Sequence, residues 1–372
     1  MSLTMPLLHK NDENDVTCRH KNDIFKGGTT ATPPKLNTLI IPVKEEVKRK
    51  GKILMIHGWA QNAKVFCFKT KNLARKLSMA GYECIYLEAP FLLPMTSMVN
   101  VEGNPVEIVN GKRENARAWF YYSDIDRSDA TLALSEQHMK YIGLEESVNS
   151  IGSFLRLQEE EEEEKERRHK NSEGEQLQYE QYCDDGDDDN DNFCAVLGFS
   201  QGAVFAHVLA CLSSRARLHD QKKKESTGSK FRDTTEEEPS TTEEEPSTTN
   251  KSDIDVLLPF RKIDCVILAS GFPAMHGNDG NNEGEATPLP QIESLSTHQI
   301  AHILSSSSCI YMPSLHLIGR SDTSVVPNLS LKLASKFFDG QLLLHDKGHM
   351  VPQKSAQSQE IIAFLDKIKE TG

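Results

Sequence analysis

Residues 193–204 contain the feature that most constrains how this chain can fold. An apolar, partly β-branched run leads into Gly198-Phe199-Ser200-Gln201-Gly202, and helical spacing continues over 203–212. This strand–turn–helix pattern is the G-x-S-x-G nucleophile elbow, in which a strained turn lifts a serine hydroxyl above the carboxyl end of a parallel sheet. Glycines at both ends of the motif lack a Cβ, so the strand and the helix can approach closely. The motif therefore predicts a nucleophilic serine, Ser200, at one edge of an α/β sheet.

Apolar runs on both sides of this motif predict the rest of the sheet. Such runs, separated by segments of helical spacing, indicate mostly parallel strands covered by helices on both faces. The predicted strands are 36–43, at an edge of the sheet, and 52–58, 83–90, 263–271, 313–319 and 341–345. The predicted helices are 64–80, 135–158, 292–304, 328–338 and 355–369.

Two polar segments interrupt this alternation of strands and helices. Residues 159–191 contain 16 acidic and 4 basic residues, nearly the whole formal net charge of −13. Residues 214–255 include Glu-Glu-Glu-Pro-Ser-Thr-Thr twice in tandem, and the proline in each unit excludes a coiled coil. Because neither segment can bury enough apolar surface to offset its ordering entropy, both are predicted to be disordered insertions. The organisation expected is a flexible lead-in, 1–35, followed by a single domain, 36–370.

The composition excludes several classes of protein. No run of about 18 apolar residues is present, so no membrane span is predicted, and the amino terminus does not resemble a secretion signal. The eight cysteines form no C-x-x-C pair, which implies neither a zinc site nor a disulfide framework. The aromatic run 117–122 has no basic stripe beside it, which favours core or pocket lining over nucleic-acid stacking. We expect a cytoplasmic protein, with the nucleus left open, that needs no metal or cofactor.

A serine hydroxyl needs a base and an oriented acid before it becomes a good nucleophile. Asp322 follows the predicted strand 313–319, and His349 follows the last predicted strand. The carboxyl ends of parallel strands meet at one edge of the sheet, so both side chains are expected to converge on Ser200. The order Ser…Asp…His is typical of the α/β-hydrolase arrangement. The rival histidines at 298, 302, 316 and 345, and the rival Asp339, fall within strands, a helix or a turn.

The tetrahedral intermediate of acyl transfer needs two N–H donors. The first is expected from the backbone of Gln201, the residue after the nucleophile. The second is expected from the loop after His57-Gly58, where Trp59 is the predicted donor. His57 itself is interpreted as a structural residue that holds this loop rather than as a second base.

Four motifs carry a resemblance to a known family. Ile-His-Gly-Trp-Ala-Gln-Asn at 56–62, Arg-Ala-Trp-Phe-Tyr at 117–121, Gly-Phe-Ser-Gln-Gly at 198–202 and Gly-His-Met-Val-Pro at 348–352 resemble the FSH family of serine hydrolases, in family order. The resemblance implies an α/β-hydrolase fold without a large lid and a cytosolic carboxylesterase or thioesterase. It also implies a triad of Ser200, Asp322 and His349. The two insertions and the lead-in depart from the family pattern.

The sequence thus predicts a hydrolase that cleaves a small-molecule ester, or equally a thioester, through an acyl-enzyme intermediate. An acyltransferase using the same triad stays open, as does a scaffold that binds basic proteins through its acidic insertions. The apolar segment 91–99 is either a substrate wall or ordinary loop packing. The substrate, its acyl-chain length and the oligomeric state are left open.

Overall fold

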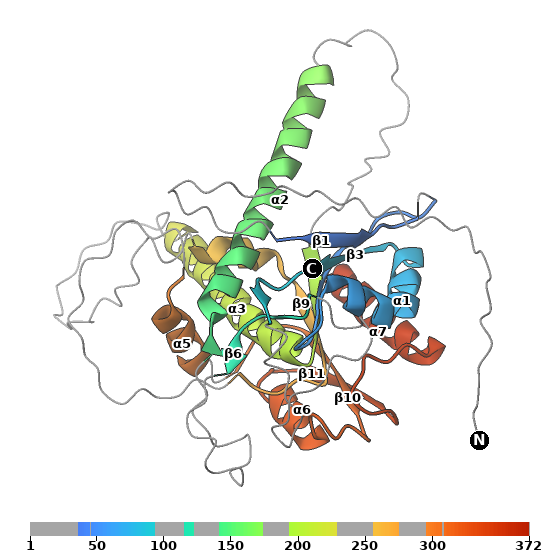
Figure 1. Ribbon diagram of the computed structural model, residues 1–372. Coiled ribbons are helices and arrows are strands. Elements are labelled where there is room, and N and C mark those ends of the chain that lie inside the picture. Colours follow the sequence, from blue (N-terminus) through green and yellow to red (C-terminus); the bar gives the residue numbers. More distant parts are fainter. Residues whose placement is uncertain are drawn as a thin grey trace, which may run out of the picture.

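The computed structural model of the chain describes residues 36–44, 46–93, 115–122, 141–173, 193–228, 256–274, 295–306 and 309–371 (Figure 1). Several predicted features lie outside these residues. They are the lead-in 1–35, the apolar residues 94–99, the end of the first insertion from residue 174 onward and the tandem repeat at 236–249.

A seven-stranded sheet forms the centre of the described structure, in the order β1-β3-β2-β8-β9-β10-β11. All neighbouring strands are parallel except β1, which pairs antiparallel with β3 at one edge. The strands are β1 (Thr38–Ile41), β2 (Gly51–Ile56), β3 (Tyr82–Leu87), β8 (Phe193–Phe199), β9 (Cys265–Ala269), β10 (Ser314–Gly319) and β11 (Gly340–His345). The predicted strands and the predicted edge position of residues 36–43 are confirmed.

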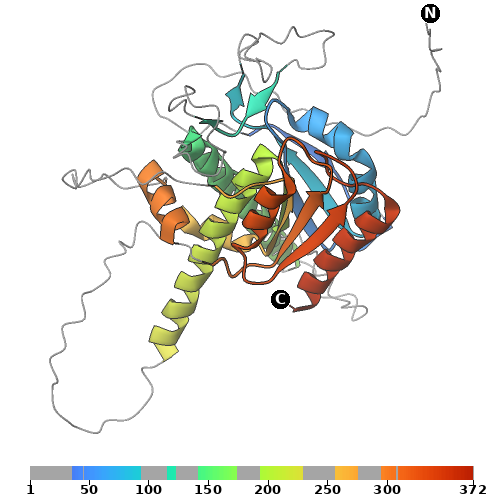
Figure 2. The ribbon, with the colours of Figure 1, turned by 90° about the horizontal axis from the view of Figure 1, so that it is seen from below.

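Helices cover both faces of this sheet, as Figure 2 shows. On one face lie α1 (Ala63–Met79) and α7 (Ser355–Thr371). On the other lie α2 (Leu144–Glu173), α3 (Gln201–Gly228), the 3-10 helix η2 (Leu258–Lys262), α5 (Thr297–Ser306) and α6 (Pro327–Ala334). Two small antiparallel sheets pair β4 (Phe91–Leu92) with β5 (Arg117–Ala118) and β6 (Tyr121–Tyr122) with β7 (Tyr141–Ile142). The architecture is the three-layer α/β arrangement that the sequence predicts.

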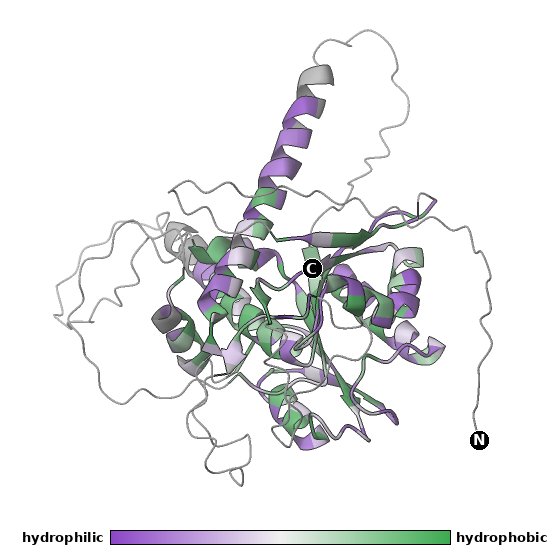
Figure 3. Cartoon of the chain, viewed as in Figure 1, coloured by the Kyte–Doolittle hydropathy of each residue, from purple (hydrophilic) through white to green (hydrophobic). Residues whose placement is uncertain are grey.

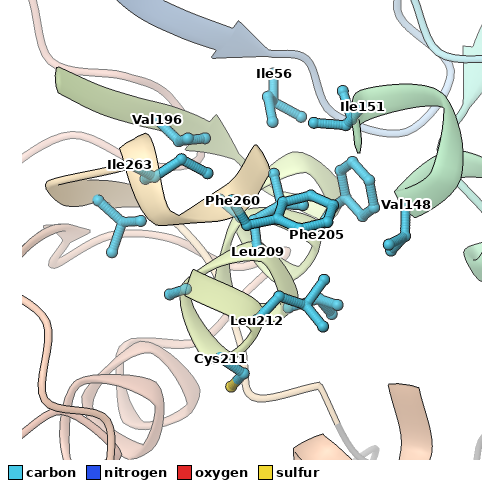
Figure 4. Packing of buried hydrophobic residues seen from close by; sticks show 14 of the residues in the cluster. Ile56, Val148, Ile151, Val196, Phe205, Leu209, Cys211, Leu212, Phe260 and Ile263 are labelled. Carbon is cyan, nitrogen blue, oxygen red and sulfur yellow. The ribbon is translucent and has the colours of Figure 1, made fainter. Parts of the chain in front are cut away.

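The core is divided by the sheet because successive strand residues face opposite sides. Ile56 of β2 belongs to the cluster under α2 and α3, whereas its neighbour Met55 belongs to the cluster under α1 and α7. In Figure 4, Phe205 of α3 lies near Phe260 of η2, and Ile151 of α2 belongs to the same cluster. All of these side chains are fully buried or nearly so. This packing fixes α3, the helix that follows the nucleophile motif.

Helix α2 differs from its prediction at both ends. The helix was expected from residue 135, but Tyr141 and Ile142 form strand β7, and the helix begins at Leu144. It then continues to Glu173, so residues 159–173 are helical rather than the start of a disordered insertion. Figure 3 shows the hydrophilic part of α2 extending beyond the other helices and strands.

Ion pairs to the body explain why α2 continues past the predicted boundary. Glu162 pairs with Lys52 of β2 at 3.0 Å and with Lys262 at 3.6 Å. Glu159 lies 3.5 Å from both Arg261 and Lys262. The acidic composition predicted that this segment is exposed to solvent. Glu159 and Glu162 instead lie beside positively charged side chains of the folded domain.

Helix α3 also continues beyond its predicted end. Residues 214–228, assigned to the second insertion, extend the helix to Gly228. Ala216 in this part is buried, and Arg217 contacts the Ile263 carbonyl oxygen at 2.6 Å and the Asp264 carboxylate at 2.8 Å. Contacts with the strand β9 region therefore extend the helix beyond its last apolar run.

Within the described ranges, no helix is long and apolar enough to cross a membrane. The same residues contain no group of three or more His, Cys, Asp or Glu side chains arranged to hold a metal ion.

Candidate active site

Ser200 occupies a strained turn between β8 and α3. Its φ of 54° lies in the left-handed region that non-glycine residues rarely adopt. The flanking glycines make the turn sterically feasible. A Cβ at Gly198 would lie 2.3 Å from the Gly202 carbonyl oxygen, and one at Gly202 would lie 2.3 Å from the Ile56 carbonyl oxygen. The Ser200 N–H donates to the Ala269 carbonyl oxygen of β9 at 2.9 Å, which ties the turn to the sheet.

Three predicted site residues lie in one hydrogen-bonded chain. His349 Nε2 is 3.0 Å from Ser200 Oγ, and His349 Nδ1 is 2.9 Å from Asp322 Oδ2. Each residue follows a strand at the carboxyl edge of the sheet: Ser200 after β8, Asp322 after β10 and His349 after β11. An imidazole in this position can accept the serine proton while the carboxylate fixes its tautomer. Ser200 and His349 are partly exposed, while the Asp322 carboxylate is buried.

The second oxygen of Asp322 is held by the backbone. Oδ1 accepts hydrogen bonds from the N–H groups of Ser324 and Val325, both at 2.9 Å. Burial alone raises the pKa of Asp322, but the hydrogen bonds from Val325 and His349 outweigh burial and lower it below its ordinary value. The carboxylate therefore stays ionised opposite His349, with each oxygen assigned to its own donors.

The two hydrogen bonds that link Ser200, His349 and Asp322 involve none of the rival residues. His316 is buried within β10, with Nε2 3.0 Å from Ser314 Oγ. His345 is buried at the end of β11. Asp339 precedes β11, so it lies at the amino ends of the parallel strands, whereas Ser200 lies at their carboxyl ends. His302 is exposed on α5, and the side chain of His298 lies outside the described residues.

The predicted oxyanion donors flank Ser200. Gln201 is the first residue of α3, and the first N–H groups of a helix have no acceptor within the helix. The helix N-terminus also carries a partial positive charge that favours an anion. Trp59 follows β2, the strand next to β8. The loop passes close to the nucleophile, because a Cβ on the neighbouring Gly58 would lie 3.2 Å from Ser200 Cβ.

His57 holds the loop that carries Trp59, as interpreted from the sequence. Its Nδ1 is 2.8 Å from the Gly58 carbonyl oxygen, and its Nε2 accepts a hydrogen bond from the Ala89 N–H at 3.1 Å. Burial, aided by the nearby Arg117 charge and opposed by the Gly58 hydrogen bond, lowers the pKa of His57 to about 4. A neutral ring with both nitrogens bonded to backbone is a structural element rather than a base.

The aromatic run 117–122 joins the two loops that flank Ser200, and sequence reasoning missed this role. The Trp119 indole N–H donates to the His57 carbonyl oxygen at 2.9 Å. The Trp119 backbone N–H donates to Gln201 Oε1 at 3.0 Å, and Gln201 Nε2 donates to the Phe120 carbonyl oxygen at 2.8 Å. The only sequence signal was the density of aromatic residues, which indicated burial but no partner.

Arg117 anchors this run to the end of β3. Its Nη1 donates to the carbonyl oxygens of Ala89 and Pro90 at 2.9 and 3.1 Å, and its Nε lies 3.4 Å from the Glu88 carboxylate. The next residues of that loop, Phe91 and Leu92, pair antiparallel with Ala118 and Arg117. The start of the predicted apolar loop is therefore a strand.

Comparison with known proteins agrees with these motifs. The profile of the serine hydrolase (FSH1) family matches residues 47–361. Esterase AAEL000016 of Aedes aegypti is 22% identical over 322 residues, covering 86% of this chain and 77% of that protein. Esterase OVCA2 of Danio rerio is 23% identical over 319 residues, covering 86% and 97%. The crystal structure of Zea mays acyl-protein thioesterase 2 aligns with 12% identity and a TM-score of 0.42, covering 89% of this chain and 98% of that one. With a family match across most of its length and an α/β-hydrolase fold, the chain belongs to the serine hydrolase (FSH1) family.

Proposed function

We propose that the protein hydrolyses carboxylic esters through an acyl-enzyme intermediate formed on Ser200. The observation that carries this proposal is the continuous chain Ser200 Oγ, His349, Asp322, with contacts of 3.0 and 2.9 Å. The names of the Aedes aegypti and Danio rerio relatives, both esterases, support an ester as the substrate.

In the acylation step, Ser200 Oγ attacks the ester carbonyl carbon and His349 Nε2 takes the hydroxyl proton. Asp322 holds Nδ1–H and stabilises the imidazolium. As the carbon–oxygen bond to the leaving group breaks, His349 returns the proton to the departing alkoxide. Water then repeats the sequence on the acyl-enzyme: His349 accepts its proton, the acid is released and Ser200 Oγ is reprotonated.

The negative charge on the tetrahedral intermediate is stabilised by the backbone N–H groups of Gln201 and Trp59. One such donor is typically worth about 10² to 10³ in rate. The strain at Ser200 and the start of α3 orient the Gln201 N–H, and the hydrogen bonds of His57 and Trp119 hold the loop of Trp59.

A thioester is an equal candidate because the same steps apply when a thiolate departs instead of an alkoxide. Parallel assays with p-nitrophenyl esters and acyl thioesters of matched acyl chains separate the two substrates. Addition of acceptor alcohols to the same reactions detects acyl transfer, which would appear as a new ester product.

The deciding experiment is labelling of the purified full chain with a fluorophosphonate probe beside Ser200→Ala. We expect labelling and ester hydrolysis in the wild type and loss of both in the variant. Absence of labelling in a wild-type protein with a cooperative thermal transition would reject an activated Ser200. It would favour a non-catalytic scaffold, for which binding of a basic protein at low and high salt is the direct assay.

A further inference from the structure

The strand β11 forms one open edge of the sheet. It pairs with β10 and has no second neighbour in the strand order of the described residues. Edge strands present unpaired backbone groups, and proteins usually protect them with charged residues or proline. The opposite edge strand, β1, is followed by Pro42 and Lys44. β11 reads Gly-Gln-Leu-Leu-Leu-His and contains neither a charged residue nor a proline, although Asp339, Asp346 and Lys347 flank it.

This edge is also apolar. Leu342 and Leu344 are 48% and 44% exposed, although leucines of a sheet are usually covered. Just before the strand, Phe338 is 70% exposed and stacks on Tyr311, which is 65% exposed, with a ring-centroid distance of 5.2 Å. Exposed apolar groups beside unpaired backbone indicate a surface suited to another strand.

The direction of the backbone groups limits how such a strand can pair. Arg320 donates its N–H to the His345 carbonyl oxygen at 2.8 Å, so His345 directs its backbone groups toward β10. In a parallel strand, alternate residues direct their N–H and C=O groups to opposite sides. Gly340, Leu342 and Leu344 therefore direct theirs to the open edge. An antiparallel partner of the same sequence must place even-numbered residues opposite even-numbered residues.

Charge complementarity selects one register among those allowed. When Leu342 lies opposite Leu344 of a second copy, Asp339 lies opposite Lys347 of that copy. Asp339 is exposed in the turn just before the strand, and Lys347 is exposed two residues after the end of the strand. A shift of two residues in either direction places Asp339 opposite His345 or His349 instead, and the match is lost. We propose that the chain forms a two-fold symmetric dimer in which β11 pairs antiparallel with β11 of a second copy in this register.

The dimer continues the sheet across the two-fold axis and places the exposed leucines of both copies side by side on one face of the sheet. Lys347 lies two residues before His349, so the interface adjoins the loop that carries the histidine of the candidate active site.

Light scattering coupled to size-exclusion chromatography of the full chain tests the proposal. We expect a dimer for the wild type and monomers for Asp339→Lys and for Lys347→Asp, because each substitution places like charges opposite each other. The two variants carry complementary charges, so an equimolar mixture should form a heterodimer. Lys71→Asp, an exposed charge reversal on α1, is the matched control and should leave the dimer intact.

Leu342→Pro provides an independent test, because it removes a backbone N–H that points away from β10, where proline is tolerated at a sheet edge. Circular dichroism establishes that each variant is folded, and a folded Leu342→Pro monomer supports the pairing. A wild type that is monomeric at the highest concentration reached would overturn the proposal. So would a dimer that survives both charge reversals, or folded variants whose mixture stays monomeric.

Discussion

The indole N–H of Trp119 donates to the carbonyl oxygen of His57 at 2.9 Å, although 62 residues separate them in the chain. His57 holds the loop of Trp59, and the backbone of Trp119 also binds the side chain of Gln201. One residue thus ties together the two segments that supply the proposed oxyanion donors.

Replacement of Trp119 by Phe should lower kcat about tenfold, a fraction of the loss expected when an oxyanion donor is removed outright. The phenyl ring can still stack on Phe205, whose ring centroid lies 4.8 Å from that of Trp119, but the hydrogen bond to His57 is lost. Steady-state kinetics should show this lower kcat with little change in KM. The affinity of the variant for a trifluoromethyl ketone should fall as well. Phe260→Leu, in the same core, is the control and should reduce thermal stability but not kcat. Equal effects of the two variants on kcat would contradict a role in positioning.

Replacement of Asp322 by Asn should reduce kcat about 10⁴-fold, because an amide cannot fix the required imidazole tautomer. KM should change little, and fluorophosphonate labelling should slow in parallel. Glu360→Gln, which removes an exposed carboxylate on α7, is the control and should retain full kcat. A fully active Asp322→Asn variant would remove Asp322 from the proposed mechanism.

Acid should destabilise the fold through three buried histidines. Burial is the main cause that lowers the pKa of His57 and His207 to about 4 and that of His316 to about 3. These rings are neutral in the folded state, whereas in the unfolded chain they bind protons below about pH 6.5. Stability is therefore fully present above pH 6.5 and falls as the pH drops toward 4, by about 1 kcal/mol per histidine at pH 5.5.

Urea unfolding at pH 7.5 and pH 5.5 measures this loss. His207→Gln should reduce the difference between the two pH values, whereas His302→Gln should not, because His302 is exposed. Equal free energies of unfolding at the two pH values would reject the neutral, buried state of these rings.

Replacement of Glu162 by Gln should lower the free energy of unfolding by about 1–2 kcal/mol, because the nearly buried Lys52 loses its charged partner. Glu163→Gln is the matched control. Glu163 pairs with the exposed Arg167 at 3.4 Å, and the loss of this exposed pair should cost less than about 0.5 kcal/mol. Urea unfolding at pH 7.5 compares the two variants, and similar losses would mean that α2 is not anchored through Glu162.

The sequence was most informative where one local pattern determines the structure. Gly198 and Gly202 flank a serine that only a strained turn can accommodate, and the apolar runs predicted every strand of the central sheet. The positions of Asp322 and His349 after their strands led to the same edge as Ser200. The geometry that the triad requires is present, and its catalytic role stays a prediction.

Features that depend on distant partners could not be predicted in the same way. Glu162 reads as a solvated residue of an acidic run until Lys52, 110 residues away, is placed beside it. The side chain of Gln201 has no visible partner until the 117–122 run folds over it. In both cases the sequence shows the residue but not its partner, because only tertiary packing brings the two together.

Helices α2 and α3 run from the carboxyl ends of the parallel strands, where Ser200 lies, toward the amino ends of these strands. Tyr141, just before α2, stacks edge to face on Phe120 beside Gln201, whereas Glu162 reaches Lys52 at the beginning of β2. Helix α3 starts at the nucleophile, and its Arg217 reaches Asp264 just before β9. Both helices therefore end, at Glu173 and Gly228, on the side of the domain remote from Ser200. A reporter domain inserted after Glu173 or Gly228 should therefore leave turnover unchanged.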